Sequence, residues 1–169
     1  ISYDYDYAGY FDTNDQGTTF NKYAYNKLTV LESEDDAATV NMGSKYRMPT
    51  TADFEELIDN TTITYIDIED NELTEKEFDR VGIAAGRFKG IRLTGINGNS
   101  IYIPAAGVIA SSDIRENNYF LCVWSSELKV DKQKSEHAYC LFGDSECGSP
   151  SAFMAGNRFE GKPVRGVCN

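Results

Sequence analysis

The segment Phe88–Pro104 carries the strongest local signal in the chain, a β-hairpin. Two β-prone runs lie on either side of Asn97-Gly98, and both of these residues tolerate the positive φ of a type I′ turn. Pro104 has no amide hydrogen to donate, so it is expected to end the second strand or to lie at a sheet edge. Antiparallel β-structure is therefore predicted, and Ala105-Ala106-Gly107 allows close backbone packing before a further strand at Tyr119–Trp124.

A short helix is predicted well before the hairpin. Ser33, with Asp36 three residues later, is a helix-start pattern, and Gly43 is a typical helix end. Ala37 and Val40 lie three residues apart and are expected to share the buried face. The predicted helix has about two turns.

A second short helix is predicted after Pro49. Thr50 can cap it, because Asp53 follows three residues later and completes the capping pattern. The spacing of three apolar residues favours one face toward the core, Phe54, Leu57 and Ile58. The acidic residues between and after them are expected to face water, Glu55, Glu56 and Asp59.

The rest of the N-terminal half predicts strands and surface turns. Ile1–Phe20 begins with alternating tyrosine and aspartate, which is typical of an edge strand, and continues into a solvated turn at Asp12–Gly17. Tyr23–Leu31 and Thr62–Ile68 predict further strands. Asp67–Arg80 is strongly charged and is expected to be an excursion on the surface.

Charge and length exclude several classes of function. The 169 residues suit one domain, 1–169, and 41% hydrophobic residues favour a folded chain. Sixteen Lys and Arg stand against 27 Asp and Glu, a net charge of −11, so nucleic acid and anionic membrane surfaces are not expected partners. No apolar run approaches the roughly 18 residues that direct membrane insertion requires. Because the sequence begins with Ile1, it is expected to be a processed form or a piece of a longer chain.

The four cysteines all lie in the last third of the chain: Cys122, Cys140, Cys147 and Cys168. Three disulfide pairings are possible and the sequence does not choose among them; buried free thiols are a further alternative. The spacings lack a C-x₂-C pair and only His137 could supply a nitrogen ligand, so no metal site is predicted.

Motifs for catalysis are absent. The sequence has no nucleophile elbow, phosphate-binding loop, dinucleotide fingerprint or zinc-protease motif. A cysteine nucleophile would have to use His137, which is the only histidine. We therefore expect a protein without enzymatic activity, catalytic residues or cofactors.

The segment 118–167 is predicted to display a binding surface. Trp124-Ser125-Ser126 lies near its start and Arg158–Arg165 near its end. Between them, the residues are polar and rich in turn formers, and they show no periodicity. The fold class expected for the whole chain is α+β, with N-terminal strands and a loop in residues 1–31, two short helices, small antiparallel sheets and this long irregular C-terminal region.

Five motifs occur in an order that resembles one family. They are Lys45–Leu57 (KYRMPTTADFEEL) preceded by Asp36-Ala37-Ala38, Asn97–Gly107 (NGNSIYIPAAG), Trp124-Ser125-Ser126, Ala138-Tyr139, and Arg158-x-x-Gly161-x-x-Val164-Arg165. Together they resemble the Fibrobacter succinogenes major paralogous domain family of bacterial surface proteins, whose fold is C-type-lectin-like. The chain is also similar to the variable proteins of diversity-generating retroelements, which are the nearest functional relatives of this family.

The resemblance implies an extracellular ligand-binding domain on a bacterial surface or a phage virion, within a larger assembly, that binds a protein or glycan on another cell or particle. The expected binding residues lie in the irregular middle of the C-terminal segment: Glu127, Lys129, His137, Tyr139, Asp144, Ser151, Phe153, Met154, Asn157 and Phe159. The expected structural residues are Trp124, Arg158 and Arg165. Whether Phe153 is exposed or fills the underside of its own loop stays open at this point.

Two alternative functions remain from the sequence. One is a structural component of a fimbria or tail fibre, in which Ile1–Tyr10 completes the sheet of a neighbour. The other is an oxidase, because the same broad fold also hosts the formylglycine-generating oxidases, which use cysteine chemistry.

Overall fold

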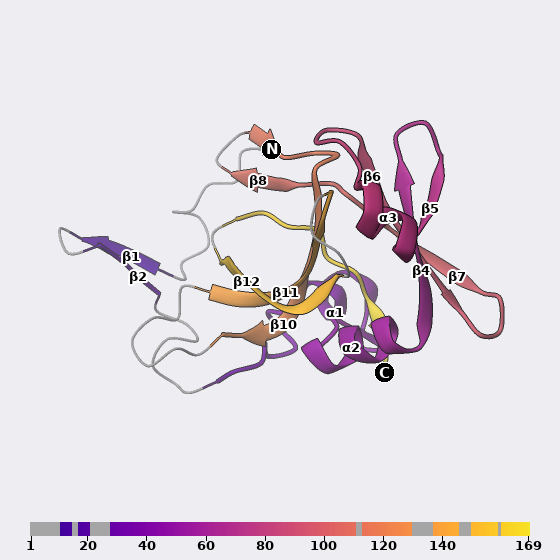
Figure 1. Cartoon of the computed structure of the whole chain (residues 1–169). Coiled ribbons are helices and arrows are strands. Elements are labelled where there is room, and N and C mark those ends of the chain that lie inside the picture. The colour runs from indigo at the N-terminus through magenta and orange to yellow at the C-terminus, as the bar shows by residue number, and fades with distance from the viewer. Residues whose placement is uncertain are drawn as a thin grey trace.

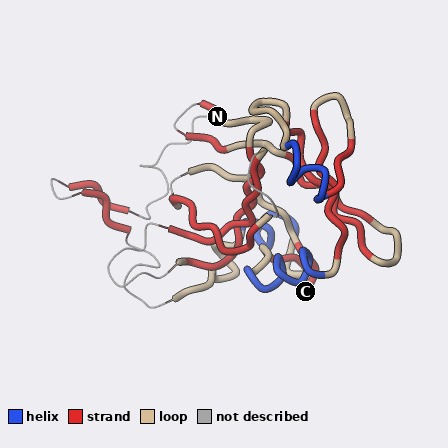
Figure 2. The backbone as a smooth tube through the Cα atoms, viewed as in Figure 1, coloured by secondary structure: helices blue, strands red, loops and turns tan. Residues whose placement is uncertain are grey.

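Short helices and small antiparallel sheets make up the structure, a computed structural model that describes residues 11–14, 17–20, 28–110, 113–129, 137–145, 150–158 and 160–169 (Figures 1 and 2). The helices in these ranges are α1 (Ala37–Met42), α2 (Thr51–Asp59) and α3 (Glu75–Val81). The strands are β1 (Phe11–Asn14), β2 (Gly17–Phe20), β3 (Tyr46–Arg47), β4 (Thr61–Asp67), β5 (Glu72–Thr74), β6 (Phe88–Gly95), β7 (Ser100–Pro104), β8 (Val108–Ala110), β9 (Asp113–Arg115), β10 (Phe120–Leu128), β11 (His137–Asp144), β12 (Ser151–Asn157) and β13 (Val167–Cys168). The predicted α+β class is confirmed at this level.

The predicted hairpin forms β6 and β7 of a four-stranded sheet with the order β5-β4-β6-β7, in which β7 is an edge strand. Side chains on one face are buried, among them Ile63, Ile91 and Ile103. The opposite face carries threonines and ion pairs, because successive residues of a strand point to opposite sides. Pro104 ends β7 as predicted.

The turn between β6 and β7 differs from the prediction. Gly98 has a φ of +81°, but Asn97 is not in the left-handed region, so a type I′ turn is wrong. The side-chain oxygen of Asn97 instead accepts a hydrogen bond from the amide of Asn99 at 2.9 Å. This bond favours a longer loop, which closes with the Gly95 amide donating to the Asn99 carbonyl.

A three-stranded sheet with the order β10-β11-β12 replaces the predicted irregular insert. The prediction of a C-terminal segment without regular structure is therefore wrong for residues 137–144 and 151–157. Periodicity is hidden because β10 is buried on both faces: Leu121 and Val123 face one cluster, whereas Cys122 and Phe120 face another. A strand buried on both sides has no polar alternation.

The main core joins the two sheets to α2 and α3. Phe54 of α2, Phe78 of α3 and Leu141 of β11 belong to one buried cluster. The rings of Tyr65 and Phe78 stack with their centroids 3.8 Å apart and their planes within 7°. Such aromatic packing contributes about 1 kcal/mol beyond the buried area.

Helix α3 corrects the prediction that Asp67–Arg80 is a surface excursion. Thr74 and Glu77 form a capping box at its start, and Phe78 is 1% exposed. The capping pattern T-x-x-E was present in the sequence, but only one apolar side chain of this short helix reaches the core. The prediction of two helices missed this third one.

Helix α1 begins later than predicted. Its N-cap is Asp36, not Ser33, and it ends at Gly43 as predicted. The buried side chain is Ala38, whereas Val40 is 61% exposed, so the predicted buried face is wrong. Asp36 sets the start because its carboxylate accepts from the amides of Thr39 and Met48, both at 2.8 Å.

Helix α2 confirms its prediction in full. Thr50 and Asp53 form the capping box, Phe54 is buried, and Leu57 and Ile58 pack against the core. The three acidic residues expected to face water are exposed, Glu55, Glu56 and Asp59.

At the N-terminal end, β1 and β2 form a hairpin, so the predicted turn at Asp12–Gly17 is wrong for the residues in these strands. The Tyr/Asp alternation of Ile1–Tyr10, with the structural role predicted for it, lies outside the described residues. In Tyr23–Leu31, residues 28–31 are described, and Val30 forms an isolated bridge with Glu127.

The C-terminal strand β13 pairs antiparallel with β3, so Val167 lies opposite Arg47 and Cys168 opposite Tyr46. This pairing places Val167 and Cys168 beside β3, the strand that precedes α2. In the part of the chain that the structure describes, no helix has both the length and the apolar character needed to cross a membrane.

Candidate binding surface on the three-stranded sheet

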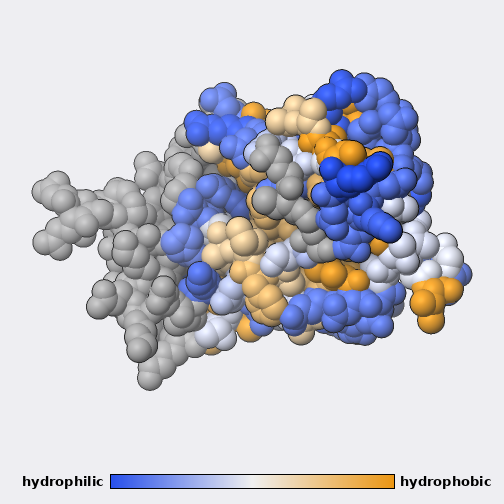
Figure 3. Space-filling view, in the orientation of Figure 1, coloured by the Kyte–Doolittle hydropathy of each residue, from blue (hydrophilic) through white to orange (hydrophobic). Residues whose placement is uncertain are grey.

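Strand β12 is the outer strand of the three-stranded sheet, paired with β11 on one side (Figure 1). Two adjacent apolar side chains on it are open to solvent: Phe153 is 52% exposed and Met154 is 44% exposed. Phe153 lies on the same face of the sheet as Tyr139, whereas Met154, opposite Cys140, and Ser151, opposite Phe142, lie on the other face. We call these four residues, which lie on both sides of the sheet along its β12 edge, the β12 surface. In the space-filling view, pale orange, mildly apolar surface lies over β11 and β12 (Figure 3).

A bulge produces this exposure. Cys140 lies opposite Met154, but Phe142 lies opposite Ser151, so Ala152 and Phe153 together face the single residue Leu141. Ala152 turns inward and is 3% exposed, whereas Phe153 turns outward, and its amide donates to the Ser151 hydroxyl at 3.3 Å. Bulges of this kind re-aim side chains at sheet edges.

Phe153 is held in place by Tyr139. Their ring centroids are 6.2 Å apart and the planes are nearly perpendicular, at 88°. Tyr139 pairs with Ala155 in register, so Phe153 is its diagonal neighbour on the same face. Phe153 therefore belongs to a strand and is exposed, which answers the question that the sequence left open.

Ser125 connects this surface to β10. Its hydroxyl donates to the Tyr139 carbonyl at 2.9 Å and accepts from the Glu127 amide at 3.1 Å. The register between β10 and β11 is irregular between Trp124 and Leu128, and Ser125 satisfies backbone groups there. At least one residue of the Trp-Ser-Ser motif, Ser125, therefore has a structural role.

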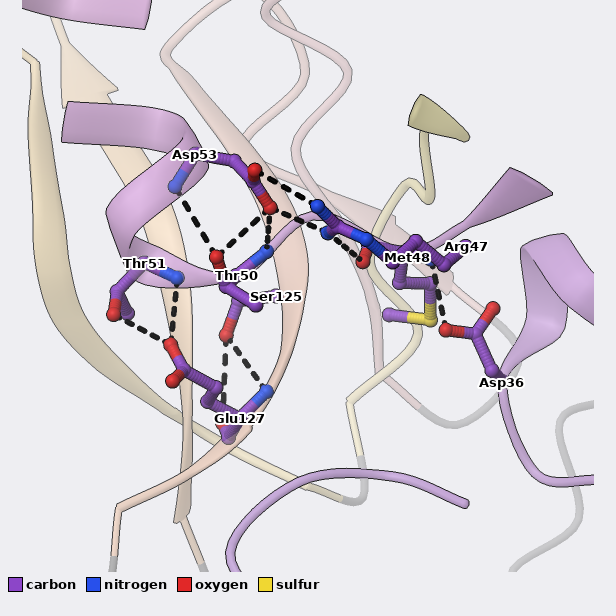
Figure 4. A network of polar contacts seen from close by, with 8 residues as sticks. All are labelled: Asp36, Arg47, Met48, Thr50, Thr51, Asp53, Ser125 and Glu127. Carbon is purple, nitrogen blue, oxygen red and sulfur yellow. Dashed lines mark hydrogen bonds and ion pairs between the residues drawn. The ribbon is translucent and has the colours of Figure 1, made fainter. Parts of the chain in front are cut away.

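Glu127 was predicted to bind a ligand, but its carboxylate is engaged inside the protein. It accepts hydrogen bonds from the amide of Thr51, at 2.6 Å, and from the Thr51 hydroxyl. This amide lies in the first turn of α2, where backbone N–H groups lack helical acceptors and negative charge is favoured. Glu127 therefore acts as a second cap that joins β10 to α2 (Figure 4).

The same helix end is fixed from its other side by Arg47 (Figure 4). The guanidinium forms two hydrogen bonds with Asp53, and Asp53 also accepts from the Thr50 amide at 2.7 Å. The Arg47 side chain is the main reason that the pKa of Asp53 lies well below its usual range. The K-Y-R-M-P-T-T-A-D motif is thus a capping network, and charge-assisted bonds of this kind are strong.

The remaining predicted binding residues lie at the ends of the strands. His137 and Asn157 pair in register and are half-buried, and the Asn157 amide donates to Glu160 at 3.1 Å. Lys129 is exposed, and Asp144 is half-buried at the end of β11. Phe159 lies outside the described residues.

The predicted structural residues have contacts in the frame. Trp124 is half-buried, and the Lys162 ammonium lies 4.6 Å from its ring centroid. The Arg165 side chain donates to the Tyr102 carbonyl on β7 at 3.1 Å. Arg158 lines a small cavity of about 130 Å³, together with Leu31, Met48 and Trp124.

Sequence reasoning missed Lys162. Its side chain is 4% exposed, pairs with Glu160 and covers the Trp124 ring. A Cβ atom on Gly156 would meet the end of the flexible Lys162 side chain at 2.6 Å, so a larger residue at this position of β12 would displace the Lys162 ammonium. No local pattern marks this contact, apart from the Glu160 charge two residues earlier.

The structure bears on two possible chemical sites, a cysteine–histidine pair and a cluster of carboxylates. Along the regular part of β11, His137 and Cys140 are three residues apart and therefore point to opposite faces, so the sheet does not bring this pair together. Glu32, Glu34 and Asp35 are the described residues whose carboxylates lie within 4.8 Å of one another. Exposed acidic groups commonly cluster without an ion.

Comparisons of this chain with protein-family models, with curated proteins and with solved structures found no match. Its function must therefore be argued from its own residues.

Proposed function

We propose that this protein is a non-enzymatic ligand-binding domain that contacts a protein or glycan through the β12 surface. The observation that carries the proposal is the adjacent exposure of Phe153 and Met154 on an outer strand. Phe153 is positioned by Tyr139 and by the bulge, so it is presented to solvent in a fixed orientation. A rigid aromatic residue loses little entropy on binding and is a common anchor at interfaces.

The chemistry of the β12 surface fits an amphipathic ligand. Burying Phe153 and Met154 would contribute roughly 1–3 kcal/mol each through loss of exposed apolar area. Tyr139 and Ser151 carry hydroxyl groups that can form hydrogen bonds beside these anchors. Aromatic rings with neighbouring hydroxyl groups can stack on a sugar ring, and an outer strand can also pair with an extended peptide.

The family assignment belongs to the same proposal: a C-type-lectin-like fold, displayed outside the cell on a bacterial surface or a phage virion and similar to diversified variable proteins. Support comes from where the motifs lie. The N-G-N-S-I-Y-I-P-A-A-G motif forms the β6–β7 turn, β7 and the segment after it, and Trp-Ser-Ser lies in the middle of β10. Both are structural positions, and three residues of the β12 surface, Ser151, Phe153 and Met154, lie between the last two motifs.

The test is binding of the purified chain to intact bacterial cells and to a glycan array. The variant Phe153→Ala with Met154→Ala should lose at least tenfold in apparent affinity, because both anchors are removed. The matched control is Ile96→Ala, which removes a fully exposed apolar side chain from the β6–β7 turn. Equal binding by the double variant and the native chain would refute the proposal.

A further inference from the structure

Cys122 and Cys140 lie on adjacent antiparallel strands and point to the same face. Cys122 pairs in register with Phe142, and Cys140 pairs with Trp124, so the two cysteines are diagonal neighbours. They are 1% and 2% exposed and share a small buried cluster with Val108 and Phe120.

The two thiols lie close enough to influence each other's protonation. The Cys140 thiol donates a hydrogen bond to the Met154 carbonyl at 3.4 Å, so Cys140 connects β11 to β12.

The surroundings make the two thiols unequal. The neighbouring Cys122 thiol, which can donate a proton to a Cys140 thiolate, and, to a lesser degree, the nearby Lys162 ammonium lower the pKa of Cys140. The influence of Cys140, together with burial, raises the pKa of Cys122. Lys162 is itself almost completely buried and is held by Glu160 and the Trp124 ring. Cys140 is thus the better thiolate of the two, and thiolates are the reactive form in disulfide exchange.

We propose that Cys122 and Cys140 form an oxidisable pair that closes to a disulfide linking β10 to β11. The oxidant is a low-molecular-weight disulfide such as glutathione disulfide, which reaches the two thiols while the chain refolds, before the sheet closes over them. The Cys140 thiolate attacks one of its sulfur atoms, which forms a mixed disulfide and releases one glutathione thiolate. The Cys122 thiol then gives its proton to that thiolate and attacks the Cys140 sulfur, and the second glutathione leaves as a thiolate that takes a proton from water. Two cysteine thiols are oxidised and one oxidant disulfide is reduced to two thiols.

The disulfide would change the contacts that hold β12 against β11. Once oxidised, Cys140 has no proton to donate, so the hydrogen bond to the Met154 carbonyl is lost. The bond between β10 and β11 becomes covalent at the same time. This inference does not depend on the proposed binding function, because the link joins β10 to β11 and involves no ligand.

The experiment maps the cysteines of the full chain after reduction and after refolding in a glutathione redox buffer. Free thiols are alkylated with iodoacetamide in denaturant, and the peptides are analysed by mass spectrometry. We expect one linked pair of peptides, containing Cys122 and Cys140, only after oxidation. Alkylation of both residues in the oxidised folded chain, or linkage of either one to Cys147 or Cys168, would overturn the proposal.

Thermal unfolding provides a second measurement. The link closes a loop of about 18 residues, so the oxidised chain should melt roughly 5–10 °C above the reduced chain. The control is Cys168→Ser, which removes an exposed thiol and should keep the full redox difference in melting temperature. Cys140→Ser should abolish this difference; if this variant does not fold, the peptide map of the native chain still decides the pairing.

Discussion

The four-stranded sheet and the three-stranded sheet differ in the side chains that they expose to solvent. The outer face of the first carries Thr62, Thr64 and Thr94 in neighbouring rows, with an ion pair between Arg92 and Glu72. The outer strand of the second exposes adjacent apolar side chains, Phe153 and Met154. The first sheet therefore presents mainly polar groups on this face, whereas the second leaves apolar groups open to solvent at its edge. Exposed apolar groups of that kind favour contact with a partner.

The largest effect is expected at the core that the two sheets share. Phe78→Ala should lower the free energy of unfolding by about 3–5 kcal/mol, because it leaves a cavity beside Tyr65. Urea denaturation measures this change. Val81→Ala, on the same helix and 62% exposed, should change stability by less than about 0.5 kcal/mol. If both substitutions changed the free energy of unfolding only slightly, α3 would be a surface insertion, as the sequence predicted.

The next effect is expected at the network that supports both sheets from α2. Asp53→Asn removes a carboxylate that pairs with Arg47 and caps the helix, so stability at pH 7 should fall by about 1–3 kcal/mol. The pKa of Asp53 is depressed in the folded state. Its stabilisation is therefore complete above the unfolded pKa near 4 and is lost as the pH falls below that value.

Chemical denaturation at pH 7 and at pH 2 tests this dependence. The difference between the native chain and Asp53→Asn should shrink markedly at the lower pH. Asp59→Asn, at the opposite end of the same helix and exposed, serves as the control and should change little at either pH. A difference that does not depend on pH would contradict the role given to the carboxylate.

A smaller effect is expected where the three-stranded sheet meets α2. Glu127→Ala removes the contacts with Thr51 and should cost about 1 kcal/mol of stability, in the range of a lost helix cap. Binding to the cells or glycans used above should be retained. Loss of binding without loss of stability would place Glu127 on the binding surface instead of in the frame.

The smallest effect on stability is expected on the β12 surface itself. Phe153→Ala should change the melting temperature by no more than roughly 2 °C, because the ring is 52% exposed and contacts mainly Tyr139. Binding should nevertheless fall at least tenfold. A large loss of stability would mean that Phe153 is a core residue of the sheet and would remove the contrast between the two sheets.

Local signals in the sequence predicted local structure well. The capping box and apolar stripe of α2 and the β6–β7 hairpin each depend on residues that are close in the sequence, and both were confirmed. The predicted turn type was wrong because the Asn97 side-chain oxygen accepts a hydrogen bond from the Asn99 amide. Helix α3 failed because charged residues surround its single buried side chain, Phe78.

Contacts between distant residues could not be predicted. Glu127 and Thr51 are separated by 76 positions, and no pattern near Glu127 indicates that a helix end lies beside it. The bulge opposite Leu141 breaks the alternation that would have marked β12 as a strand. Tyr139, Phe153 and Met154 were named from the sequence as candidates, but their position on the neighbouring strands β11 and β12 became visible only with the register of the sheet.

The pairing of β3 with β13 has a consequence for the order in which the protein is made. Arg47 lies opposite Val167. The ribosome must therefore synthesise the sequence from β3 through Val167 before β3 and β13 can pair. Chain synthesis proceeds at about 5–20 residues per second, which leaves β3 without this neighbour for several seconds at least. Helix α2 and the β6–β7 hairpin need no such wait, so the nascent chain should acquire its local elements first and join β3 to β13 last.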